Sequence, residues 1–188
     1  MKLYIIRHGE SQTNRDKLWT GWLDVPLTEL GEDQAKSVRP VIKNVKFDKI
    51  YSSDLTRAKK TAEIAIPGCS YETTPLLREV ALGRLEGTPL GGLSDDSRLS
   101  VSKNGYKDFG GESYDELMER TKEFFDTVAK LDCECVAAFS HAGFLRTAMD
   151  LALGIKIPRS KVVCNNCAIA IFELSGREWK FHSLINSQ

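Results

Sequence analysis

The chain has 188 residues, of which 41% are hydrophobic and 28% are charged, and its 26 lysines and arginines balance its 26 aspartates and glutamates. This composition excludes a disordered or fibrous protein, and the zero net charge excludes a global positive field that would recruit nucleic acid or an acidic membrane surface. One domain over residues 1–188 is expected from the length. The N-terminal apolar run is short and charged residues follow it almost at once, whereas an export signal or a membrane span has a longer apolar segment. We therefore expect a cytoplasmic protein.

The first predicted elements are a strand and a helix. Residues 3–6 form an apolar, β-branched run that ends at Arg7-His8-Gly9, which is typical of a buried strand that delivers polar residues into a loop. Residues 27–45 carry apolar residues at helical spacing. We expect a helix there, with Thr28 as its N-cap and Pro40 kinking or splitting it.

A second strand and helix follow. The strand is expected over residues 47–51, and the helix over residues 54–66 with Ser53 or Asp54 as its cap. Arg57 then lies in the first turn of this helix. Because helix N-termini present free backbone N–H groups and the positive end of the dipole, an arginine there adds to an anion site.

The middle of the chain contains a weakly patterned segment and a clear helix start. Residues 85–111 are rich in Gly, Ser, Asp and Lys, which predicts a loop or a short irregular helix. Ser113-Tyr-Asp-Glu116 has the form of a capping box and predicts a helix that runs to about Leu131.

The last third is predicted to contain a strand, a helix and a hairpin. Residues 135–139 form a continuous apolar run that ends at Ser140-His141-Ala142-Gly143, and residues 144–153 are expected to form a helix closed by Gly154. Strand-like residues 168–174 and 179–184 predict a terminal hairpin.

Strands that alternate with helices favour a three-layer α/β/α architecture with a mostly parallel sheet and an antiparallel hairpin at its edge. Ligands bind outside the carboxyl ends of the strands in such sheets. His8 and His141 are both expected at that end.

The five cysteines are Cys69, Cys133, Cys135, Cys164 and Cys167. An odd number without an export signal predicts reduced thiols and no disulfide framework. The last four could form a four-thiolate zinc site, but Cys133 and Cys135 are spaced more tightly than zinc ligands usually are. Small buried side chains in or beside strands are the preferred interpretation.

Four residues that suit phosphoryl transfer fall at loop or helix-start positions, namely Arg7, His8, Arg57 and His141. Phosphoryl transfer needs a positioned nucleophile and electrostatic stabilisation of the charge on the equatorial oxygens. The chain has three histidines in all, and two of them belong to this group.

Six blocks in order resemble the histidine phosphatase (phosphoglycerate mutase-like) superfamily. They span residues 4 to about 147 and begin with Arg7-His8-Gly9-Glu10-Ser11-x-x-Asn14. The other five are Trp19-Thr20-Gly21-Trp22-Leu23-Asp24-x-Pro26-Leu27-Thr28-x-x-Gly31, Ser52-Ser53-Asp54-Leu55-x-Arg57-Ala58-x-x-Thr61-Ala62, Leu77-Arg78-Glu79-x-x-x-Gly83-x-x-Glu86-Gly87, Gly110-Gly111-Glu112-Ser113 and Ser140-His141-Ala142-Gly143.

The resemblance implies that His8 attacks the substrate phosphorus and becomes phosphohistidine. This requires a neutral attacking nitrogen, with the proton on the other ring nitrogen held by an acceptor. Arg7, Arg57 and His141 would surround the transferring phosphoryl group, because the rigid guanidinium fork matches phosphate oxygens. No metal and no cofactor are implied.

The resemblance also assigns an acid and a set of contacts. Glu79 is the candidate general acid, and Glu86 is its rival unless it only supports the turn at residues 83–87. Residues at family positions that touch phosphate or the adjacent substrate are Asn14, Thr20, Gly21, Ala142 and Gly143. Trp19 and Trp22 could line the pocket mouth, although packing is the commoner role of such aromatics.

Residues 88–110 stand where the family carries a helical insert that covers the site, and this version is short. Tyr106, Lys107 and Phe109 are candidates for contact with the leaving group. The short insert favours a phosphatase of the α-ribazole or broad-specificity type acting on a small phosphorylated metabolite, as a monomer or homodimer. A cofactor-dependent phosphoglycerate mutase and a non-catalytic phosphate-binding pseudoenzyme are the alternatives.

Overall fold

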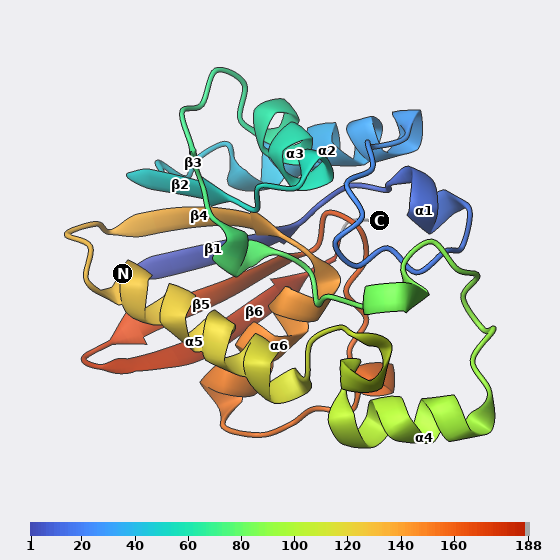
Figure 1. Cartoon of the computed structure of the whole chain (residues 1–188). Coiled ribbons are helices and arrows are strands. Elements are labelled where there is room, and N and C mark those ends of the chain that lie inside the picture. Colours follow the sequence, from blue (N-terminus) through green and yellow to red (C-terminus); the bar gives the residue numbers. More distant parts are fainter. Residues whose placement is uncertain (187–188) are drawn as a thin grey trace.

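The computed structural model describes residues 1–186, so that residues 187–188 of the expected domain lie outside the described part. Its sheet has the strand order β3-β2-β4-β1-β5-β6, in which β3, β2, β4 and β1 run parallel while β5 and β6 are antiparallel (Figure 1). The strands are β1 Lys2–Arg7, β2 Lys49–Ser52, β3 Glu72–Thr73, β4 Cys135–Ser140, β5 Ile169–Ser175 and β6 Glu178–Ile185. The predicted mostly parallel sheet with an antiparallel edge hairpin is confirmed.

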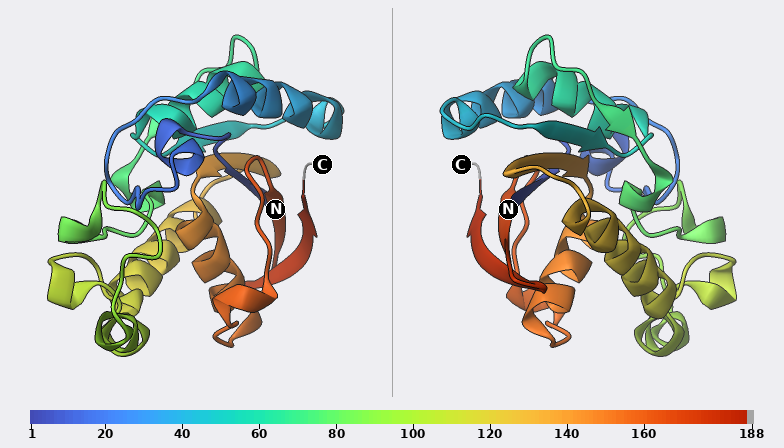
Figure 2. Two further views of the ribbon diagram at one scale, coloured as in Figure 1. Left: turned by 90° about the vertical axis from the view of Figure 1, so that its right-hand side faces the viewer. Right: turned by 90° about the vertical axis from the view of Figure 1, so that its left-hand side faces the viewer.

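Helices cover both faces of this sheet, which confirms the three layers. The helices are α1 Gln12–Arg15, α2 Glu29–Ile42, α3 Thr56–Ala65, α4 Asp95–Asn104, α5 Tyr114–Ala129 and α6 Ala142–Leu153. Figure 2 shows α2 and α3 on one side of the curved sheet and α5 and α6 on the other. Helix α4 lies beyond the end at which β1 and β4 finish (Figure 1).

The side-chain alternation of the central strands divides the core into two layers. In β1, Leu3 and Ile5 pack with Phe124 of α5 and Phe144 of α6. Ile6 faces the opposite way and packs in the cluster beneath α2 and α3. Strand β4 alternates in the same manner, so that both central strands are buried on both faces and bring their carboxyl ends to one edge.

Helix α2 begins as expected but is not split. Thr28 caps it, because its hydroxyl oxygen accepts a hydrogen bond of 3.0 Å from the backbone N–H of Gly31. The helix runs unbroken through Pro40 and ends at Ile42, before the expected residue 45. Pro40 lies in the last turn, where only a few residues follow it and the clash of its ring affects little helix.

The expected cap of α3 is wrong. The helix starts at Thr56 with Leu55 in the N-cap position, and no side chain of its own segment caps it. Asp24 accepts hydrogen bonds from the backbone N–H of Thr56 at 2.6 Å and from its hydroxyl at 2.8 Å. Asp54 instead pairs with the guanidinium of Arg78. A residue distant in sequence therefore supplies the carboxylate that this helix start requires.

The segment between residues 85 and 111 contains more structure than expected. Helix α4 has ten residues and is capped by Ser94, whose side chain accepts from the backbone N–H of Ser97. None of its residues is buried. Within α4, Val101 alone packs against an apolar cluster, and it is only partly buried. The sequence therefore lacks the apolar periodicity by which helices are predicted.

Helix α5 begins with the predicted capping box. Ser113 Oγ accepts from the N–H of Glu116 at 3.1 Å, and the Glu116 carboxylate accepts from the N–H of Ser113 at 2.8 Å. Helix α6 ends as predicted at Gly154, which adopts the left-handed conformation. Glycine permits that conformation without steric strain.

All five cysteines are free thiols, and Cys164 and Cys167 are buried. Within residues 1–186, no group of three or more His, Cys, Asp or Glu side chains is arranged to hold a metal ion, so the four cysteines considered above do not form a zinc site. No helix in the described part of the chain has the length and apolar character that crossing a membrane requires.

The capping box should contribute measurably to stability. Ser113→Ala removes the hydroxyl that accepts from Glu116, and we expect the free energy of unfolding to fall by about 1 kcal/mol. Ser102→Ala, in the exposed interior of α4, is the matched control and should change it by less than about 0.5 kcal/mol. Urea unfolding of the three proteins followed by circular dichroism measures both values, and equal losses would contradict the capping role.

Candidate active site

Two histidines meet where the central parallel strands end. His8 follows β1 and His141 follows β4, and the backbone N–H of His8 donates to the carbonyl of Ser140 at 2.9 Å. The centroids of the two imidazole rings are 5.0 Å apart. Both side chains are buried. The expected juxtaposition at the carboxyl ends of the strands is therefore present.

The ring of His8 is fixed by its own loop. Nδ1 lies 2.6 Å from the carbonyl oxygen of Gly9, and since a carbonyl can only accept, Nδ1 carries the proton. Burial lowers the pKa of His8 well below its ordinary value, and the positive charges of Arg57 and Arg7 lower it further. The ring is therefore neutral, and Nε2 carries a free lone pair.

The loop that carries His8 is tied to the helix that carries Arg57. The N–H of Gly9 donates to Thr61 Oγ1 at 3.1 Å, and the Thr61 hydroxyl donates to the carbonyl of Arg57 at 2.7 Å. A Cβ on Gly9 would lie 2.2 Å from the carbonyl oxygen of Gly31. Glycine is thus required at residue 9 by the close approach of α2 to this loop.

Arg57 is fully buried and holds the backbone of a distant loop. Its Nη1 donates to the carbonyl of Leu23 at 2.7 Å, and its Nη2 donates to the carbonyl of Gly21 at 2.8 Å. Burial lowers the pKa of Arg57 to about 10, against the opposing influence of the Glu79 carboxylate. The guanidinium remains charged at neutral pH and is held beside the two imidazoles.

Arg7 reaches the segment before β5. Its Nη1 donates to the carbonyl of Cys164 at 2.6 Å. Burial lowers its pKa, the carboxylate of Glu79 raises it, and the charge of Arg146 lowers it. Arg7, Arg57 and Glu79 are therefore close enough to influence one another electrostatically.

Glu79 lies at the N-terminus of α6. Its Oε1 accepts from the N–H of Gly143 at 2.9 Å and from the N–H of Val80 at 2.9 Å. A Cβ on Gly143 would lie 2.1 Å from that oxygen, so glycine there lets the carboxylate approach the helix end. Among the described residues, Glu79 is the one carboxylate that lines the cavity defined below.

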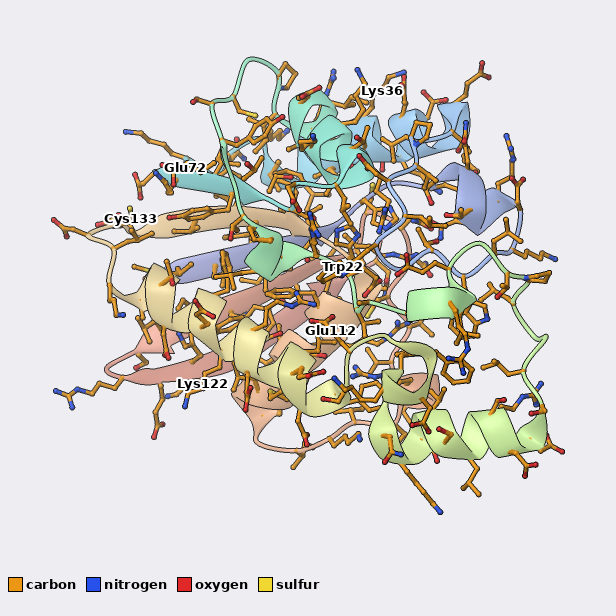
Figure 3. All side chains as sticks on the ribbon, viewed as in Figure 1. Trp22, Lys36, Glu72, Glu112, Lys122 and Cys133 are labelled. Carbon is orange, nitrogen blue, oxygen red and sulfur yellow. The ribbon has the colours of Figure 1, made fainter. Side chains whose placement is uncertain are left out.

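The backbone of Glu79 is held from two sides. Trp22 Nε1 donates to the Glu79 carbonyl at 2.7 Å. Arg120 donates to the same carbonyl at 3.2 Å and pairs with Glu112 at 2.8 Å. Figure 3 labels Trp22 and Glu112, which lie near each other on the side of the sheet that carries α5. This network fixes the position of the candidate acid.

Glu86 lies in a different environment from Glu79. Its Oε1 accepts from the N–H of Trp22 at 2.8 Å and from the N–H of Leu82 at 3.1 Å, which braces the turn. It is absent from the cavity lining. The supporting role considered from the sequence therefore describes Glu86 better than the role of rival acid.

A cavity of about 370 Å³ opens over His8. Nine of the ten residues selected from the sequence line it: Arg7, His8, Asn14, Thr20, Gly21, Arg57, Glu79, Ala142 and Gly143. The tenth, His141, is fully buried beside the His8 ring. Of the covering insert, Tyr106 lines the cavity, whereas Lys107 pairs with Glu116 and Phe109 lies under Arg84.

Sequence reasoning missed two further arginines in the lining, Arg146 and Arg159. Arg146 follows Ala142 by four residues on α6, so helical spacing places both on one face and could have identified it. Arg159 lies in a short 3-10 turn, Arg159–Lys161, for which no sequence pattern predicted a place in the site.

The arrangement can bind an anion and present it to a neutral imidazole. Within residues 1–186, four arginines line one cavity, and the charges of two of them, Arg7 and Arg57, act on the buried rings of His8 and His141. Guanidinium groups in such a setting bind phosphate oxygens strongly.

Comparison with known proteins gives one relative that this chain matches over most of both lengths and two that it matches over about half to two thirds of their own length. A protein of Salmonella paratyphi A named "Probable phosphoglycerate mutase GpmB" is 30% identical over 95% of this chain and 87% of its own length. The fructose-2,6-bisphosphatase TIGAR of Xenopus tropicalis is 37% identical over 70% of this chain and 51% of its own. The match to a 2,3-bisphosphoglycerate-dependent phosphoglycerate mutase of Xanthobacter autotrophicus, at 35% identity, covers 68% of this chain and 63% of that protein.

A solved structure also has this fold. The "putative alpha-ribazole-5'-P phosphatase" of Escherichia coli superposes with a TM-score of 0.85 at 25% identity, over all of this chain and 97% of that one. The family model of the histidine phosphatase superfamily (branch 1) matches residues 3–187. This match includes His8, His141 and the arginines that line the cavity, and it spans nearly the whole sequence. The chain therefore belongs to the histidine phosphatase superfamily.

Proposed function

We propose that the protein is a metal-independent phosphatase that hydrolyses small phosphate monoesters through a phosphohistidine formed at His8. The observation that carries the proposal is the neutral His8 ring, whose Nδ1 proton is held by the Gly9 carbonyl while Nε2 is free to attack. Arg7 and Arg57 supply fixed positive charge beside that nitrogen. This arrangement offers a nucleophile and electrostatic stabilisation together.

In the first step, Nε2 of His8 forms a bond to the substrate phosphorus while the ester P–O bond breaks. The carboxyl group of Glu79 donates its proton to the leaving oxygen, and the alcohol departs. Arg7, Arg57 and His141 stabilise the negative charge on the equatorial oxygens. Because the arginines are held by backbone carbonyls, they need little reorganisation as charge develops.

In the second step, water attacks the phosphorus and the P–N bond breaks. The carboxylate of Glu79 takes a proton from the attacking water, and inorganic phosphate is released from a His8 that is again neutral. The position of Glu79 between the cavity and the α6 N-terminus suits both transfers.

A mutase is the second candidate, because two of the relatives carry that name. A mutase would return the phosphoryl group to a bound glycerate in place of water. The short insert between residues 88 and 110 favours water as the acceptor, since it contributes only Leu90 and Tyr106 to the cavity lining and adds no charged group there. Release of inorganic phosphate in the absence of any acceptor other than water separates the two activities.

The His8 nucleophile has a direct test. His8→Ala should abolish hydrolysis of a generic aryl phosphate, whereas EDTA should leave the wild-type rate intact. His182→Ala, at the third histidine on β6, is the matched control and should retain activity. Equal slow rates for the wild type and His8→Ala would indicate a protein that binds phosphate ligands without turnover, and loss of activity in EDTA would refute metal independence.

The role of Glu79 is tested by varying the leaving group. Glu79→Gln should lower kcat/KM for alkyl phosphates by about 100-fold or more and for nitrophenyl phosphates by much less, since good leaving groups need little protonation. Steady-state kinetics over a series of leaving groups measures the difference. A uniform loss across the series would assign Glu79 a role other than acid.

The neutral state of the buried histidines predicts a pH dependence of stability. Burial, followed by the charges of the nearby arginines, lowers the pKa of both His8 and His141. The unfolded chain takes up protons at both sites below about pH 6.5, so the folded state loses stability as pH falls from there by up to about 1.4 kcal/mol per pH unit for each ring. Denaturant unfolding between pH 7 and 5 should show a shallower slope for His8→Asn than for the wild type, and identical slopes would contradict a neutral His8.

A further inference from the structure

We infer that Gln34 is a positioning residue for His8, because its side chain holds the peptide group whose carbonyl accepts the proton of His8 Nδ1. This inference deepens the proposed phosphatase mechanism and rests on that function. Gln34 lies in α2 and does not line the cavity over His8. It acts on the nucleophile through the peptide group that joins Gly9 to Glu10.

The two polar ends of this peptide group have different partners. The carbonyl oxygen of Gly9 lies 2.6 Å from His8 Nδ1, and the N–H of Glu10 donates to Gln34 Oε1 at 2.8 Å. Because a peptide group is planar, its C=O and its N–H keep a fixed orientation relative to each other. A hydrogen bond that fixes the N–H therefore also fixes the direction of the carbonyl that faces His8.

The face of α2 that touches this loop brings Gln34 to it. The backbone N–H of Thr28 donates to the Glu10 carbonyl at 2.9 Å, and the Thr28 hydroxyl donates to Glu10 Oε1 at 2.7 Å. A Cβ on Gly31 would lie 2.8 Å from the backbone nitrogen of Glu10, so glycine leaves room for the close approach. Gly31 and Gln34 follow Thr28 at intervals of three residues, which makes them neighbours on the helix surface.

The hydrogen bonds form one chain from Gln34 to His8. It runs from Gln34 Oε1 to the N–H of Glu10, across the peptide group, and from the Gly9 carbonyl to His8 Nδ1. Hydrogen bonds that are linked in this way polarise one another, and they are stronger where water is largely excluded. Since His8 is buried and Gln34 is partly buried, the bond to Gln34 makes the Gly9 carbonyl a stronger acceptor.

The chain supports positive charge on the His8 ring. Burial, followed by the charges of Arg57 and Arg7, lowers the pKa of His8, whereas the hydrogen bond to the Gly9 carbonyl raises it. Positive charge develops on the ring as Nε2 bonds to phosphorus, so a polarised carbonyl stabilises the transition state more than the neutral ground state. Loss of the acceptor at Gln34 should therefore lower kcat and leave KM nearly unchanged, because Arg7 and Arg57 are held by other carbonyls.

Three substitutions of Gln34 test this role by steady-state kinetics. Gln34→Met and Gln34→Ala remove the acceptor while favouring a helix. In both, kcat for a nitrophenyl phosphate should fall by about tenfold or more, while KM and the inhibition constant of inorganic phosphate change by less than about threefold. Gln34→Glu keeps an acceptor oxygen and should recover kcat to within about threefold of the wild type. Gln12→Met, at an exposed position of α1, is the matched control.

Nuclear magnetic resonance of the His8 ring separates positioning from a loss of structure. The resonance of the Nδ1 proton moves downfield as its hydrogen bond strengthens, and it is assigned by its absence in His8→Asn. It should move upfield in Gln34→Met and Gln34→Ala and keep its wild-type position in Gln12→Met. Thr28→Ala loosens the same loop and removes the N-cap of α2, but leaves the bond between Glu10 and Gln34. This variant should lose stability while it keeps kcat and the Nδ1 resonance.

Several results would overturn the inference. They are an unchanged kcat or an unchanged Nδ1 resonance in Gln34→Met, a parallel loss of phosphate binding, a Gln34→Glu variant that is as slow as Gln34→Met, and an equal loss of kcat in Thr28→Ala. Failure of both acceptor-free variants to fold would assign Gln34 a structural role and would also overturn it. An upfield resonance in those variants, together with hydrolysis that His8→Ala does not change, would refute the phosphatase and leave the positioning of the ring standing.

Discussion

The site depends on two buried imidazoles that lie beside the buried guanidinium of Arg57 and the partly buried guanidinium of Arg7. Burial and the arginine charges act in the same direction on His8 and His141, so that both rings stay neutral. A neutral ring has one nitrogen with a proton and one without. The Gly9 carbonyl accepts the proton of His8 Nδ1 and so decides which nitrogen is free. The same positive charges that keep the ring neutral are those that would attract its anionic substrate.

Buried and partly buried arginines are tolerated here because each one also joins segments of backbone. Arg57 donates to two carbonyls of the loop at residues 21–23, Arg7 donates to Cys164, and Arg120 donates to the carbonyls of Leu76, Arg78 and Glu79. A buried charge is unfavourable unless hydrogen bonds satisfy it. The carbonyls meet that requirement for the terminal nitrogens, whereas the Nε atoms of Arg7 and Arg57 are buried without a hydrogen-bond partner among residues 1–186. The same hydrogen bonds fix loops without regular secondary structure around the cavity. Removing such an arginine would therefore disturb position as well as charge.

Much of the fold and site could be predicted because the signals are local. Apolar runs that stop at Arg7-His8 and at Ser140-His141 place both histidines at strand ends, and parallel pairing of β1 with β4 makes those ends neighbours. Three features leave no local pattern in the sequence. Asp24 caps a helix that begins 32 residues later, α4 buries none of its residues, and Arg159 enters the cavity from a turn. The cap of α3 and the position of Arg159 depend on residues distant in sequence, and α4 faces mainly solvent.

The two ends of the cavity differ in how firmly they are held. At the phosphoryl end, His8, Arg57 and Glu79 are each fixed by hydrogen bonds to backbone atoms at 2.6 to 2.9 Å. At the other end, Arg159 is held by longer contacts with Thr147 and Asp150 of α6 and by the ring of Tyr114. Bond formation at phosphorus needs a geometry fixed to a fraction of an ångström, whereas contact with the rest of a substrate tolerates adjustment of a long side chain. In the proposed reaction the rigid end would therefore fix the geometry at phosphorus, and the more loosely held end would adjust to the rest of the ester.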